Sequence, residues 1–135
     1  MPRLARYENA VLFALRVFAG LLFFEHGLNK LFGFPHSEMA QPAALTLVWW
    51  AGLIEFVAGF LLTAGVMTRL VAFLAAGEMA VAYFVFHAPV GPFPISNKGE
   101  LAILYCFIFL YFAVVGGGAW SIDALRERKR GRESS

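Results

Sequence analysis

The sequence is poor in cysteine and in charged residues, and both shortages exclude whole classes of protein. Its sole cysteine is Cys106, so the chain can form neither an internal disulfide nor a CxxC redox pair. Only 15% of its 135 residues are charged, whereas 60% are hydrophobic. A soluble globule of this composition would have too little polar surface to cover its core. We therefore expect a membrane protein without a separate soluble domain to hold a cofactor of its own.

Long apolar runs, separated by glycine and proline, supply the expected membrane spans. Each is near the ~20 residues that a hydrocarbon core ~30 Å thick requires. The sequence therefore predicts an all-α fold, a bundle of four transmembrane helices with short loops, followed by a short interfacial helix that Ser121 caps and whose first turn holds Asp123. The expected spans are residues 11–32, 44–66, 70–88 and 101–115, within a membrane domain of residues 1–125 and before a basic tail of residues 126–135.

The distribution of basic residues predicts the orientation. Four crossings place both termini on one side, and that side collects Arg3, Arg6, Arg69 and the basic tail, whereas the opposite loops carry Lys30 and Lys98. By the positive-inside rule, both termini are expected in the cytoplasm. The net charge of +2 comes largely from the tail, where a basic run beside a span favours contact with anionic lipid over binding of nucleic acid.

Four polar residues are expected to meet in one layer deep in the bundle. They share the faces that carry small residues such as Gly20, Gly27, Gly52 and Gly59, which let helices approach closely. The layer holds one arginine and two glutamates. In one interpretation the arginine pairs with one of the glutamates, and the pair only fixes the register of the helices. In the other, the glutamate that is left without the arginine exchanges protons, as in a proton relay or a quinol site. These residues are Arg16, Glu55, Glu78 and Tyr105.

A second polar cluster is expected near the outer edge of the membrane. It is either ordinary polarity at helix ends, with the lysine reaching for the interface, or a pocket for a ligand such as a quinone head group, walled by aromatic rings. Two histidines lie at similar depth, but no HExxH or paired ExxH motif accompanies them, so neither a metal site nor haem is expected. The cluster comprises Glu25, His26, Lys30, His87 and Glu100.

Polar and glycine motifs follow one another along nearly the whole chain. They are Arg16, His26-Gly27-x-x-Lys30-Leu31-Phe32-Gly33, Glu55-x-x-x-Gly59, Leu62-Thr63-x-Gly65-x-x-Thr68-Arg69, His87-x-Pro89-x-Gly91-x-Phe93, Lys98-Gly99-Glu100-Leu101-Ala102 and Gly116-x-Gly118-x-x-Ser121-x-Asp123. In this order, they resemble the motifs of the DoxX family of small four-helix membrane proteins, although Glu25 and Glu78 lie outside the family pattern.

The resemblance implies a prokaryotic inner-membrane protein connected with redox processes, either quinone-linked or concerned with oxidative and thiol stress. It supplies no agreed catalytic residues, and it leaves open whether the chain catalyses a reaction. The leading hypothesis is a membrane subunit that contacts quinone and docks a redox protein. One alternative is a scaffold or assembly factor without chemistry, and the other is a small transporter built from a homo-oligomer.

Overall fold

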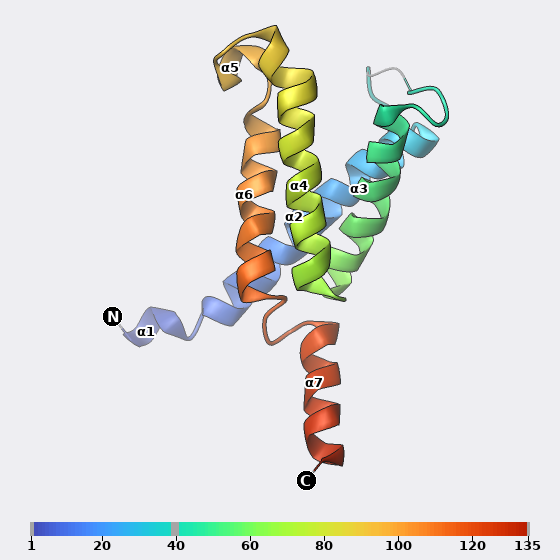
Figure 1. The fold of residues 1–135 in the computed structure, drawn as a ribbon. Coiled ribbons are helices and arrows are strands. Elements are labelled where there is room, and N and C mark those ends of the chain that lie inside the picture. Colours follow the sequence, from blue (N-terminus) through green and yellow to red (C-terminus); the bar gives the residue numbers. More distant parts are fainter. Residues whose placement is uncertain (1, 39–40, 135) are drawn as a thin grey trace.

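The computed structural model describes residues 2–38 and 41–134, and every regular element in these ranges is helical. The chain begins with a short turn of helix and then forms four longer apolar helices and a charged C-terminal helix (Figure 1). The elements are α1 (Pro2–Ala5), α2 (Glu8–Phe32), α3 (Leu47–Ala64), α4 (Thr68–Ala82), the π-helix η1 (Tyr83–His87), the 3-10 helix η2 (Ala88–Val90), α5 (Pro94–Asn97), α6 (Glu100–Val115) and α7 (Ile122–Glu133).

Three of these helical stretches are long and apolar enough to cross a membrane, namely Glu8–Phe32, Leu47–Ala64 and Thr68–Val90. The all-helical fold and three of the expected spans are therefore confirmed. The fourth expected span is α6, an apolar helix of 16 residues. At 1.5 Å per residue it is about 24 Å long, shorter than a typical hydrocarbon core.

Local capping explains why the second span is shorter than expected. The Thr46 hydroxyl accepts a hydrogen bond from the Trp49 amide, so α3 begins at Leu47 rather than at residue 44. At its other end, Gly65 adopts a left-handed conformation with φ of 72° and ends the helix. The connection from α3 to α4 is consequently very short, which makes the two helices antiparallel neighbours (Figure 1).

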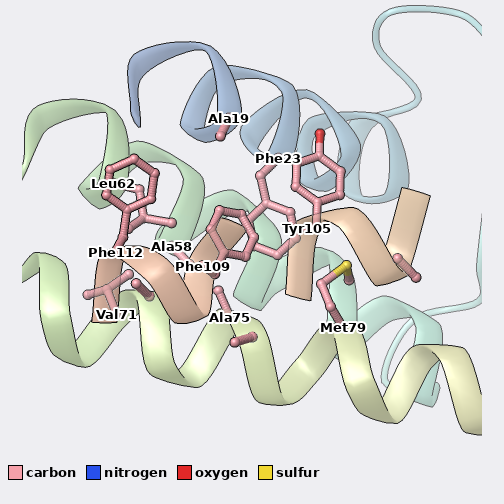
Figure 2. Packing of buried hydrophobic residues seen from close by; sticks show 13 residues of the cluster. Ala19, Phe23, Ala58, Leu62, Val71, Ala75, Met79, Tyr105, Phe109 and Phe112 are labelled. Carbon is pink, nitrogen blue, oxygen red and sulfur yellow. The ribbon is translucent and has the colours of Figure 1, made fainter. Parts of the chain in front are cut away.

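The helices pack as two pairs around one apolar core. α2 lies against α3, and α4 lies against α6 (Figure 1). Side chains from all four helices meet between the pairs, among them Phe23, Leu62, Ala75 and Phe109 (Figure 2). The Phe23 and Phe109 rings make an edge contact with centroids 4.8 Å apart. This core fills much of the space between the two pairs, and the cavity described below lies toward the end of the bundle where α6 begins.

The contact between α2 and α3 depends on glycine. A Cβ atom on Gly20 would lie 2.6 Å from the Thr63 hydroxyl oxygen, and one on Gly52 would lie 2.7 Å from the Lys30 Cβ. Similarly, a Cβ on Gly27 would meet the backbone of Phe56. Small residues therefore let the two backbones touch, which confirms the packing role predicted for these glycines.

We expect Gly27→Ala to lower the free energy of unfolding by about 1–3 kcal/mol, because its methyl group would push α2 and α3 apart. Gly77→Ala is the matched control, since nothing lies within 4 Å of a Cβ atom at that position of α4. Alanine there should be neutral or slightly stabilising. Unfolding of both variants in mixed detergent micelles tests this, and equal stability of the two would contradict the close helix contact.

The C-terminal helix α7 begins as expected at a serine cap. The Ala124 amide donates to the Ser121 hydroxyl oxygen at 3.2 Å, and the helix continues through residues expected to form the basic tail, as far as Glu133. Figure 1 shows α7 extending away from the end of the bundle rather than folding back against it. A location of α7 along the membrane surface therefore stays a prediction.

Candidate functional site

A cavity of about 390 Å³ lies between the two helix pairs, toward the end of the bundle where α6 begins. Its volume falls in the range of small-molecule sites, roughly 300–1,000 Å³. Each of the four long helices contributes to its wall, together with η1 and the loops beside it. The lining residues are Phe23, His26, Asn29, Lys30, Pro42, Val48, Ala51, Glu55, Glu78, Met79, Ala82, Phe86, His87, Lys98, Leu101, Ala102 and Tyr105.

An ion pair between α2 and α3 forms the polar side of this cavity. The Lys30 ammonium lies 2.7 Å from the Glu55 Oε1 atom, and Glu55 is only 2% exposed. The close glycine contact between the helices makes room for this pair, because the Lys30 side chain packs directly over Gly52. Burial makes the pair depend on both partners, since removal of either would leave a charge without compensation.

Three carboxylate oxygens in the cavity wall have no hydrogen-bond partner within the described part of the chain. They are Oε2 of Glu55 and both oxygens of Glu78, and all three atoms are buried. Buried polar atoms are nearly always satisfied in folded proteins, so such a cluster requires an explanation. A bound molecule with hydroxyl or amine donors, or ordered water, would satisfy them.

Aromatic rings line the cavity beside these carboxyl groups. Tyr105 of α6 is 5% exposed and stacks on Phe109, with ring planes 17° apart and centroids separated by 5.4 Å. The Tyr105 ring also contacts Phe23 and the edge of His26. Flat apolar faces next to polar groups are suited to a planar ring that carries polar substituents.

The π-helix η1 places His87 at the cavity. A π-turn is rare and occurs often at functional sites, because it changes the direction of the side chains that follow. His87 Nδ1 lies 2.9 Å from the Asn97 carbonyl oxygen. A carbonyl only accepts hydrogen bonds, so Nδ1 carries the hydrogen and Nε2 is left for another partner.

Asn97 holds the loop that supports His87, and the sequence analysis missed it. Its side chain is 3% exposed, donates to the Gly91 carbonyl and accepts a hydrogen bond from the Gly99 amide. A single amide residue among glycines and prolines gives no distinctive sequence signal. Its role depends on contacts that the folded loop brings together.

The structure divides the expected deep layer. Glu55, Glu78 and Tyr105 line the cavity as a group, but Arg16 lies at the opposite end of the bundle. The expected pairing of Arg16 with a glutamate is wrong, because Glu55 pairs with Lys30 and the oxygens of Glu78 have no partner in the described residues. Depth counted along the helices placed these groups together, yet α2 and α3 incline to α4 and α6 (Figure 1).

Arg16 instead binds backbone carbonyls. Its guanidinium donates to Leu62 and Thr63 in the last turn of α3, and to Gly117 and Trp120 after α6, at distances between 2.6 and 3.0 Å. The end of a helix carries partial negative charge and unsatisfied carbonyl groups. A buried arginine at this position therefore satisfies its hydrogen-bond donors without a direct bond to a carboxylate.

The expected outer cluster is only partly brought together. His26, Lys30 and His87 line the same cavity as Glu55 and Glu78, so the two predicted clusters merge there. Lys30 joins them because its long side chain reaches toward Glu55 rather than toward the interface.

The two acidic members of the outer cluster lie elsewhere. Glu25 is exposed and lines a neighbouring cavity of about 340 Å³, which shares His26 and Tyr105 with the first. Glu100 is exposed and lines neither. Within residues 2–38 and 41–134, no group of three or more His, Cys, Asp or Glu residues is arranged to hold a metal ion.

A carboxylate ties the start of α7 to the start of α4. Asp123 accepts hydrogen bonds from the amides of Met67 and Thr68 and from the Thr68 hydroxyl, each 2.8 Å long. Burial acts to raise the pKa of Asp123, but the hydrogen bonds from Thr68 and Met67 and the charge of Arg126 outweigh it and lower the pKa below the ordinary 3.8. The sequence placed Asp123 in the first turn of its own helix but gave no sign that it caps α4.

Asp123→Ala is expected to cost about 1 kcal/mol of unfolding free energy near neutral pH, the usual effect of losing a helix cap. Because folding lowers the pKa of Asp123, its contribution is complete above the ordinary pKa and disappears as the pH falls through the lowered value. The difference from the parent protein should therefore shrink below about pH 4. Glu127→Ala, one turn further along α7, is the control, and an equal loss in that variant would contradict the capping role.

Comparison with known proteins decides the family. The DoxX family model matches residues 11–88, more than half of the chain. The chain belongs to the DoxX family. An uncharacterised protein of Haemophilus influenzae is 41% identical over 128 residues, covering 91% of this chain and 96% of its own length. The Escherichia coli K12 inner membrane protein YqjF is 28% identical and covers 92% of this chain and 98% of its own length. No solved structure matches.

Proposed function

We propose that this DoxX-family protein is an inner-membrane protein that binds a quinone-type ring in the bundle cavity and exchanges protons with it. The observation that carries the proposal is the group of buried carboxylate oxygens without partners, set beside aromatic walls. The name of the relative YqjF supports the inner-membrane location. The family membership, to which the sequence motifs also pointed, is consistent with a redox-associated role.

The residues of the cavity match the chemistry of a quinone couple. The oxidised ring has two carbonyl acceptors, which the Lys30 ammonium can approach, whereas the reduced ring has two hydroxyl donors, which suit the acceptors on Glu55 and Glu78. Tyr105 and Phe23 offer flat faces for the ring. Transfer of electrons must then involve a separate redox protein, because no motif of this sequence supplies a resident redox centre.

The membrane arrangement forms part of this proposal. We take α6 as a fourth span, because it packs along α4 and carries only Glu100 among charged residues. An even number of spans places both termini on one side, and the basic residues around Arg69 and α7 favour the cytoplasm. Residues 1–125 then form the membrane domain, with the cavity toward the outer leaflet.

The test is equilibrium binding of short-chain ubiquinone and menaquinone analogues to the protein in lipid nanodiscs. Glu78→Gln keeps the shape of the cavity but removes a carboxylate acceptor, and we expect binding at least about tenfold weaker, as for the loss of a charged hydrogen-bond group. Glu55→Gln should weaken binding as well, but it also removes the charge partner of Lys30, so Glu78→Gln is the decisive variant. Glu100→Gln is the matched control, because this exposed glutamate lies outside the cavity. Equal affinities in all three variants would overturn the proposal.

A scaffold role is the second candidate, and a different observation supports it. Arg16 of α2 binds the end of α3 and the turn after α6, and Asp123 of α7 binds the start of α4. These contacts hold the helices together at one end of the bundle, as a structural role requires. Mass spectrometry of molecules retained after purification in mild detergent separates the two functions. Retained quinone with a redox polypeptide favours the first, and retained lipid with copies of the chain alone favours the scaffold.

A further inference from the structure

Another cavity lies at the other end of the bundle, away from the proposed quinone site. It has a volume of about 620 Å³ and opens between the start of α4, the turn after α6 and one side of α7. In Figure 1 this region is the junction beneath α4 and α6. Three arginines line it, Arg69 from α4 and Arg126 and Arg130 from α7.

Arg69 is fixed in place at this cavity. Its Nη1 donates to the Val114 carbonyl at the end of α6. Its guanidinium lies over Gly116, where a Cβ atom would come within 3.3 Å of Nε. Gly116 has φ of 82°, a conformation suited to glycine, so the turn leaves space for the guanidinium. The backbone therefore holds the Arg69 guanidinium in position, and its other N–H donors are available to a ligand in the cavity.

The two arginines of α7 lie one turn apart on the side of the helix that lines the cavity. In the described ranges, no ion pair joins Arg126 or Arg130 to a carboxylate. The oxygens of Asp123 already accept three hydrogen bonds from the start of α4. The charge of Arg126 is balanced in part by Asp123, whose pKa it lowers, and Glu127 is the other acidic residue in the lining, so three guanidinium groups share two carboxylates.

Exposed apolar side chains adjoin the arginines of this cavity, as expected where a lipid binds. Leu70 and Val115 line it, and Leu70 is 52% exposed. Trp120, 57% exposed, lies beside it in the turn between α6 and α7, a residue type typical of the membrane interface. Guanidinium groups bind phosphate through paired hydrogen bonds, and basic pockets at the ends of spans bind anionic lipid head groups.

We propose that Arg69, Arg126 and Arg130 form a binding site for the phosphate group of an anionic phospholipid, whose acyl chains pass over Leu70 and Val115. In this proposal the site ties the start of α7 to the lipid head groups at the end of the bundle. It is independent of the quinone proposal, because the two cavities share no lining residue.

The test compares lipid retention by two double variants with the same loss of charge. Arg126→Gln with Arg130→Gln removes two cavity arginines, whereas Arg128→Gln with Lys129→Gln removes two charges that do not line the cavity. Proteins in nanodiscs of phosphatidylcholine with a minor fraction of phosphatidylglycerol are transferred to detergent, and bound phosphatidylglycerol is counted by native mass spectrometry. We expect roughly a fivefold loss for each cavity arginine and little change in the control.

Equal losses in the two double variants, or no loss in either, would overturn the site. Arg69→Gln provides a second variant outside α7 and should reduce retention to a similar degree. Inorganic phosphate, added alone to the detergent-solubilised protein, identifies the source of the anion. If it binds as tightly as the lipid and with the same dependence on Arg126 and Arg130, the assignment to a lipid is overturned in favour of a free anion.

Discussion

Replacing Arg16 by methionine is expected to lower the free energy of unfolding by about 3 kcal/mol or more, a typical cost of breaking a buried polar network. Arg16 is 1% exposed and donates to four backbone carbonyls drawn from two separate segments. Methionine fills part of the volume but offers no donor, so these carbonyls lose their partner, two of them in a fully buried position. Unfolding in mixed detergent micelles measures the loss.

Arg16→Lys distinguishes the loss of charge from the loss of geometry. A lysine keeps the charge but cannot reach carbonyls on both sides with a planar group, so we expect it to recover only part of the stability. Stability of Arg16→Met equal to that of the parent chain would show that the carbonyl contacts contribute nothing. The reason for the effect differs from the one suggested by sequence, in which loss of Arg16 would have left glutamates unpaired.

Replacing Lys30 by methionine should cost about 3–5 kcal/mol, because Glu55 would remain buried without its partner. The ammonium and Oε1 lie 2.7 Å apart, and Glu55 already has one unsatisfied oxygen. The measurement is again the free energy of unfolding in micelles. A variant with Lys30→Met and Glu55→Met together should recover much of the loss, since an apolar pair of similar volume commonly replaces a buried ion pair without penalty.

A double-mutant cycle over the two single variants and the combined variant gives the coupling energy. If Lys30→Met were as stable as the parent, the ion pair would contribute nothing to stability, and Lys30 would be available to bind a ligand. If the combined variant recovered nothing, the cavity would require the polarity itself. Either result bears directly on how the carboxyl groups of the cavity are used.

Hydropathy, caps and glycine spacing predict much of this fold because they are local properties. Apolar runs gave three confirmed spans, Ser121 caps α7 as its sequence suggested, and Gly20, Gly27 and Gly52 bring α2 and α3 into contact. Each of these features depends on residues within one helix or on the size of one side chain. The periodicity of a helix is enough to find them.

The polar site was harder to predict, because its partners are set by helix inclination and by the backbone. The sequence shows side chains but not the carbonyl groups that satisfy Arg16. Depth counted from Cα positions ignores the reach of a long side chain, and Lys30 consequently joined a different group from the one expected. Asp123 and Asn97 act across turns whose geometry no short motif records.

The contacts of Arg16 also impose an order on the assembly of the protein. α2 is synthesised before α3, but the Gly117 carbonyl that Arg16 binds lies 101 residues later in the chain. Until the segment that contains Gly117 has been made, the Arg16 guanidinium can bind only the carbonyls of Leu62 and Thr63. The α2–α3 pair can form early during membrane insertion, whereas the bundle is completed at this end only when the turn after α6 has emerged.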